Sequence, residues 1–107
     1  MVSEYSIIIT TFQDKQSTRE FAKLLVETRL AACAQIIPIE SVYFWQDETI
    51  SNNETMLIIK SKTDLFDKIS SVIMEHHTYD VPEIVQIPIT GGLPEYLKWI
   101  GDSTANP

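Results

Sequence analysis

The sequence has little cysteine, glycine and histidine: its 107 residues include one cysteine, three glycines and two histidines. The single cysteine, Cys33, excludes an intramolecular disulfide and a cysteine-rich zinc site. No apolar run approaches the ~18 residues of a membrane-spanning helix, and no basic segment precedes the first apolar stretch as in a secretory signal. These absences predict a protein of a reducing cytoplasmic compartment that does not insert into a membrane.

Positive charge is also scarce, because 15 acidic side chains face 8 basic ones and the formal net charge is −7. The lysines and arginines do not cluster, so a phosphate backbone would be repelled and nucleic acid is not an expected partner. No P-loop, dinucleotide-binding glycine turn, H-E-x-x-H or G-x-S-x-G motif occurs. The sequence therefore predicts a non-enzymatic protein with no catalytic residues.

Hydrophobic residues make up 44% of the chain, which is enough for one globular domain over residues 1–107. The apolar periodicity changes several times along this domain. It predicts a strand over 5–12, a helix from about 17 to 30, a hairpin over 33–62, a helix over 63–77, a strand over 83–89 and a helix over 94–100. Ser17 is the expected N-cap of the first helix, with Glu20 completing a capping box. In the hairpin, QDET is the expected reversal and SNNE an expected bulge or loosened stretch.

The order strand-helix-strand-strand-helix-strand plus a terminal helix predicts an α+β, ferredoxin-like βαββαβ sandwich with a long central hairpin. The ordered core is expected over about 5–100, with a flexible tail over 101–107. Two helices cover one face of a four-stranded sheet, yet residues 7–9 and 56–59 are apolar at every position rather than at alternate ones. An uncovered apolar face of this kind predicts a homo-oligomer.

Several motifs together resemble one known family. The stretches RLAACAQIIPIESVYFWQDE, LIIKS, HHTYDVPEIVQIPI and YLKWI are similar, in this order and over nearly the whole chain, to the CutA divalent-cation tolerance family. The resemblance implies a compact homotrimer of ferredoxin-like subunits, as in PII-type signalling proteins. It also implies a role in tolerance to divalent metals, with copper binding attributed to some members.

His76 and His77 are the candidate metal ligands, because imidazole binds Cu²⁺ and similar cations well. The alternative is structural: His76 would extend the apolar stripe of its helix, and His77 would contact the helix's negative C-terminal end. The resemblance places a cysteine ligand of some members in the first strand, where this chain has Thr10. A hydroxyl is a poor replacement for a thiolate, so any copper or other divalent cation is expected to bind weakly, and none is needed for folding.

Two further groups of residues have a structural and a functional interpretation. Cys33, flanked by alanines, is typical of a small buried hydrophobic residue rather than a nucleophile. Aromatic residues with nearby polar groups could form subunit-interface core or line an intersubunit cleft; these are Tyr43, Trp45, Lys60, Tyr79, Glu83 and Trp99. The leading interpretation is a cytoplasmic, homotrimeric divalent-cation tolerance protein. The alternative is a PII-like signalling or scaffold protein whose cleft binds a small molecule or a partner protein.

Overall fold

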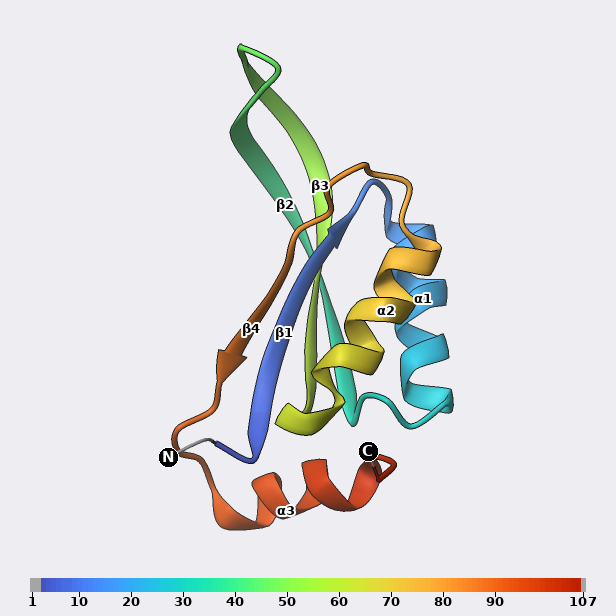
Figure 1. Cartoon of the computed structure of the whole chain (residues 1–107), viewed down its shortest axis with the longest axis vertical. Coiled ribbons are helices and arrows are strands. Elements are labelled where there is room, and N and C mark those ends of the chain that lie inside the picture. Colours follow the sequence, from blue (N-terminus) through green and yellow to red (C-terminus); the bar gives the residue numbers. More distant parts are fainter. Residues whose placement is uncertain (1–2, 107) are drawn as a thin grey trace.

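The computed structural model describes residues 3–106, which form one four-stranded antiparallel sheet and three helices (Figure 1). The elements are β1 (Tyr5–Phe12), α1 (Lys15–Glu27), β2 (Cys33–Trp45), β3 (Glu48–Lys62), a short 3-10 turn (Thr63–Leu65), α2 (Phe66–His76), β4 (Ile84–Pro88) and α3 (Pro94–Ser103). The strands lie in the order β2-β3-β1-β4. The predicted element order is confirmed, and the first strand has the predicted bounds.

Helix α1 begins two residues earlier than predicted, and its cap is Asp14 rather than Ser17. Asp14 has an extended backbone, and its Oδ1 accepts a hydrogen bond of 2.7 Å from the Ser17 backbone N–H. An aspartate is as good an N-cap as a serine, so the earlier residue takes the role. The helix ends at Glu27, and Arg29 then adopts a left-handed backbone with φ 62°.

The hairpin of β2 and β3 spans the predicted residues 33–62, but its second strand, β3, is longer than expected. Gln46 and Asp47 make its turn with φ 50° and 64°, as the tightest hairpin turns require. Strand β3 then runs without interruption, and residues 51–54 pair one to one with residues 42–39 of β2. The expected bulge at SNNE was wrong: the backbone pairing of the hairpin overrides the low strand propensity of asparagine. Within residues 3–106, no helix is both long and apolar enough to cross a membrane.

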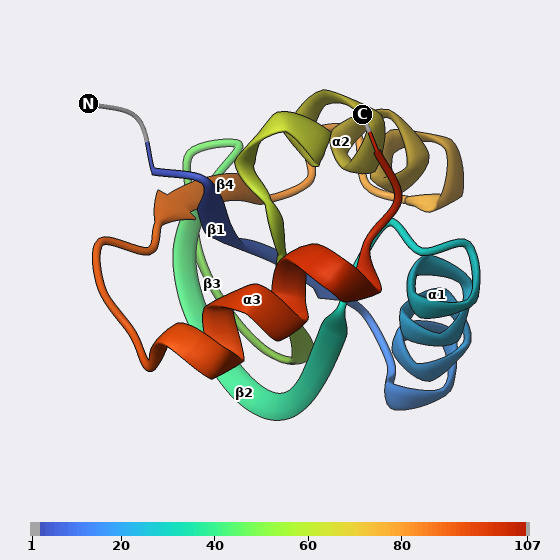
Figure 2. The same ribbon diagram turned by 90° about the horizontal axis from the view of Figure 1, so that it is seen from below.

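The core lies between one face of the sheet and the pair α1 and α2 (Figure 1). Its fully buried side chains are Ile8, Leu25, Leu57, Ile59, Leu65, Ile69 and Ile73. Each comes from the apolar periodicity of its element, alternate positions in the strands and every third or fourth in the helices. Helix α3 does not add to this layer but crosses one end of the sheet (Figure 2).

The opposite side of the sheet is called here the open face, and neither α1 nor α2 covers it; α3 reaches it only at one end, where Tyr96 contacts Lys60. Register places its members on the same side of adjacent strands; those with large apolar side chains are Ile7, Ile9, Ile37, Ile39, Met56, Ile58, Val85 and Ile87. Ile37, Val85 and Ile87 are each more than 40% exposed, and Tyr43 and Trp45 extend the same face along the hairpin. The uncovered apolar face predicted from the sequence is therefore present.

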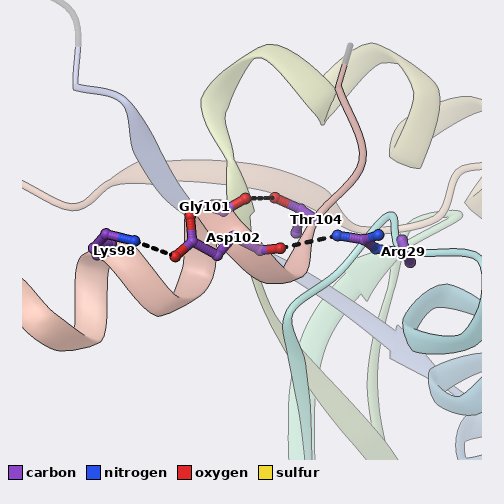
Figure 3. A network of polar contacts seen from close by, with 5 residues as sticks. All are labelled: Arg29, Lys98, Gly101, Asp102 and Thr104. Carbon is purple, nitrogen blue, oxygen red and sulfur yellow. Dashed lines mark hydrogen bonds and ion pairs between the residues drawn. The ribbon is translucent and has the colours of Figure 1, made fainter.

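The C-terminal segment differs from the flexible tail that was predicted over 101–107. Helix α3 continues to Ser103, and the N–H of Ala105 donates to the carbonyl of Arg29 at 2.8 Å. The Arg29 guanidinium donates to the Asp102 carbonyl at 2.9 Å (Figure 3), and Lys62 Nζ donates to the carbonyls of Thr104 and Ala105. Two cations thus bind the negative end of the helix, which holds the segment in place. Pro107 lies outside the described residues.

Candidate functional site

His76 is the last residue of α2, and its side chain is exposed. Its Nδ1 lies 2.9 Å from the carbonyl oxygen of Val72, one turn earlier in the same helix. Because a carbonyl only accepts, Nδ1 carries the proton and Nε2 keeps its lone pair. The described residues provide no hydrogen-bond partner for Nε2. His76 thus takes the helix-end position that the structural interpretation gave to His77, while its ring still touches Phe21 at 5.4 Å between centroids.

His77 has left the helix and is partly buried in the protein. Its Nε2 lies 2.6 Å from the carbonyl of Thr11 in β1, and its Nδ1 accepts the backbone N–H of Tyr79 at 3.1 Å. The ring stacks on Phe12 at 4.7 Å and tilts against Tyr79 at 4.5 Å. Both ring nitrogens therefore bind backbone groups, and His77 joins the start of the α2–β4 loop to β1. The packed histidine is His77, not His76 as the structural interpretation had it.

A cleft of about 640 Å³ lies where the hairpin and the α2–β4 loop meet the open face. Tyr43 and Trp45 of β2 line one wall, and Tyr79 and Glu83 of the loop line another. The backbone brings them together because β2 bends past the end of β1 (Figure 1) and Pro82 keeps the loop extended. Four of the six residues predicted for a cleft thus share one.

The other two predicted residues lie elsewhere in the subunit. Lys60 Nζ donates to the Tyr96 hydroxyl at 3.2 Å, and Trp99 lies beside the Tyr96 ring at 5.5 Å between centroids. Both contacts belong to α3, at the end of the sheet away from the hairpin tip (Figure 1). Cys33 is only partly buried and pairs with Lys60 in the sheet.

Glu54 is the most buried acidic residue of the cleft and was not predicted from the sequence. Its side chain is 9% exposed, and its Oε2 accepts the Tyr79 hydroxyl at 2.9 Å. Burial, and then the hydrogen bond to Glu54, raise the pKa of Tyr79 to about 12. Asp80 also lines the cleft. Glu54 was missed because it lies in SNNE, a stretch that had been assigned to a bulge.

Comparison with known proteins agrees with this geometry. The family model for the CutA1 divalent ion tolerance protein matches residues 6–103. The chain belongs to this family. A divalent-cation tolerance protein CutA from Thermus thermophilus is 40% identical over 99 residues, with 92% of this chain and 96% of that protein covered. The chloroplastic CutA of Arabidopsis thaliana is 39% identical, and the chain spans 56% of its length.

Solved CutA1 structures have the same fold. That from Shewanella sp. SIB1 gives a TM-score of 0.95 at 36% identity, covering 99% of this chain and 100% of that one. That from Oryza sativa gives 0.94 at 34% identity, covering 99% and 98%. The α+β fold with a four-stranded antiparallel sheet is therefore that of the CutA1 family.

A copper site built from both histidines and the first strand does not fit these CutA residues. His77 has no free ring nitrogen, and Thr10, at the position of the expected cysteine, has no exposed surface. Residues 3–106 contain no group of three His, Cys, Asp or Glu side chains arranged to hold a metal. The one imidazole available to a cation is that of His76.

Thr10 lowers the stability of the fold, because its Oγ1 is buried without a hydrogen-bond partner among the described residues. A buried hydroxyl without a partner costs about 1–3 kcal/mol, and valine has nearly the same shape. We expect Thr10→Val to raise the free energy of unfolding by about 1 kcal/mol in urea denaturation. Thr18→Val is the matched control: Thr18 is equally buried, but its hydroxyl donates to the Asp14 carbonyl at 2.7 Å. That variant should lose stability, and a loss in both would contradict the prediction.

Proposed function

We propose that this protein acts in divalent-cation tolerance as a homotrimer of ferredoxin-like subunits. The strand order β2-β3-β1-β4, with all pairs antiparallel, supports the topology. The apolar open face supports the assembly, because exposed patches of this kind mark interaction surfaces. Strand β2 adds to this: it is an edge strand of 13 residues with Phe44 70% exposed, and such edges are normally covered.

The proposed metal interaction is weak binding of Cu²⁺ or a similar cation by His76. One observation carries it: Nδ1 of His76 is held by Val72, which leaves Nε2 available on an exposed ring. Imidazole suits copper, but a single protein ligand completed by water gives little affinity. The negative charge of the chain adds a general attraction for cations. The proposed role is non-enzymatic, and cation binding is not needed for folding.

The test is calorimetric titration of Cu²⁺ into tag-free protein and three variants. His76→Ala should lower the affinity for Cu²⁺ by about tenfold or more, because it removes the available nitrogen. The heat of binding seen with the wild type should then no longer be detected. His77→Gln should bind as the wild type does, since its ring nitrogens already bind the backbone. Glu27→Gln, on the exposed side of α1, removes one negative charge and no histidine, so it measures the general attraction of the acidic chain for cations. The reverse result, with only the His77 variant losing copper, would refute the assignment.

A second candidate function is that of a PII-like signalling or scaffold protein with a ligand in the cleft. The observation that favours it is the cleft itself, whose volume of about 640 Å³ suits a small molecule. A cytoplasmic location remains our proposal for either function. Among the related proteins, one from Archaeoglobus fulgidus is described as periplasmic and that of Arabidopsis as chloroplastic.

A further inference from the structure

The chain's three glycines all lie in α3 or in the linker that leads from β4 to it. A glycine within a helix lowers its stability, but a Cβ at Gly101 would lie 3.0 Å from the Tyr5 hydroxyl, so Gly101 lets α3 pack closely on the start of β1. Gly91 meets no such demand, because its φ is not positive and a Cβ there would have no atom within 4 Å. What glycine supplies at this linker position is backbone freedom, as a hinge requires.

Helix α3 is buried mainly through its C-terminal half. Ile100 is fully buried, whereas Leu93 and Trp99 are 65% and 44% exposed. Ile100 does not belong to the cluster of buried side chains that joins the sheet to α1 and α2. Figure 2 shows the helix crossing one end of the sheet, outside that layer. Separation of α3 would therefore leave the main core packed, which is the condition for opening of one element by itself.

The C-terminal end of α3 is held by residues from two distant parts of the chain. The Arg29 guanidinium donates to the Asp102 carbonyl at 2.9 Å (Figure 3), and the Arg29 carbonyl accepts the N–H of Ala105 at 2.8 Å. Lys62 Nζ donates to the carbonyls of Thr104 and Ala105 at 3.2 and 3.1 Å. Arg29 follows the C-cap of α1 with φ 62°, a position where glycine is usual. Backbone strain of this kind marks a residue whose side chain has a role, here the contact with α3.

We propose that α3 is a hinged flap, which swings about Gly91–Gly92 and is latched closed at its C-terminal end by Arg29 and Lys62. The latch joins cations to uncharged carbonyls at a helix end, so it stabilises the closed state only modestly. Opening releases Lys60, whose ammonium donates to the Tyr96 hydroxyl in the closed state, and exposes the end of the sheet. This conformational device goes beyond the proposed functions and depends neither on copper nor on the cleft.

The test is hydrogen–deuterium exchange of the full-length protein, read by mass spectrometry. The hydrogen-bonded amides of residues 98–103 in α3 should exchange at least about tenfold faster than those of β1, which is paired on both sides. Arg29→Gly removes the guanidinium but suits the left-handed backbone, so it should accelerate exchange in α3 about tenfold without accelerating it in β1. Lys62→Met should have a similar effect on α3. Lys68→Met, which removes the same charge from the exposed side of α2, should exchange as the wild type does.

Gly91→Ala tests the hinge without removing any contact of α3. Alanine restricts the linker of the open state more than that of the closed one, so exchange in α3 should become about threefold slower. Exchange of α3 as slow as that of β1 in the wild type would overturn the inference, also where a neighbouring subunit is what holds the helix. Unchanged exchange in both latch variants, or no slowing by Gly91→Ala, would overturn it as well. If Lys62→Met failed to fold, Arg29→Gly and Gly91→Ala would still decide, and no outcome bears on the copper titration.

Discussion

Replacing Val85 and Ile37 with lysine is expected to convert the proposed trimer into monomers of 12.2 kDa. Both residues lie on the open face, on β4 and β2, and each is more than 40% exposed in the single subunit. Neither contributes to the buried core, so the fold of the subunit should survive. Only the contact between subunits should fail.

The size of this effect follows from symmetry. Each substitution occurs three times in a trimer and replaces an apolar group, worth about 1.5–3 kcal/mol on burial, with a charge. Even 2 kcal/mol at each of three copies gives about 6 kcal/mol, which weakens assembly by roughly 10⁴-fold. Light scattering at micromolar concentration should therefore give about three times 12.2 kDa for the wild type and 12.2 kDa for the double variant.

Val26→Lys is a close control for this experiment. Val26 is 42% exposed, against 43% for Val85, but it lies on α1 rather than on the open face. It should remain trimeric, which would show that one added lysine on an exposed valine does not disperse the protein. A monomeric wild type, or dissociation of the Val26 variant as well, would contradict the assembly argued from the open face.

The sequence predicted those features that depend on neighbours along the chain. The span of β1, the hairpin turn at Gln46 and Asp47 and the apolar stripe of α2 all follow from periodicity or turn chemistry. The start of α1 was misplaced because Asp14 and Ser17 are both good caps and only the backbone geometry chooses between them. Local patterns therefore gave the elements and, through their order, the architecture.

Contacts between distant residues could not be predicted in the same way. The C-terminal segment looked flexible because its composition is polar, but Arg29 and Lys62, far away in the sequence, bind its carbonyls. Glu54 was assigned to a bulge, whereas the strand pairing places it in β3, where its carboxylate accepts the hydrogen bond of Tyr79. The place of Glu54 in the candidate site thus depends on tertiary contacts that leave no periodic signal.

The two adjacent histidines show this limit most clearly, and we expect losses of stability of very different size from removing them. His77→Ala should lower the free energy of unfolding by about 3 kcal/mol. The substitution removes hydrogen bonds to Thr11 and Tyr79, worth about 1 kcal/mol each, and aromatic contacts worth about 0.5–1.5 kcal/mol each. His76→Ala should cost about 0.5 kcal/mol or less, because its ring is exposed and its one hydrogen bond lies within its own helix.

Urea denaturation of both variants in the monomeric Val85→Lys/Ile37→Lys background would measure this difference, because assembly makes stability depend on protein concentration. His77→Gln should recover part of the loss, since an amide can still donate to the Thr11 carbonyl and accept from the Tyr79 N–H. Equal losses for the two alanine variants would show that His77 does not fix the loop to β1. With the copper titration, the predicted pattern separates the histidines by role: His77 holds the wall of the cleft in place, and His76 presents a free nitrogen to solvent.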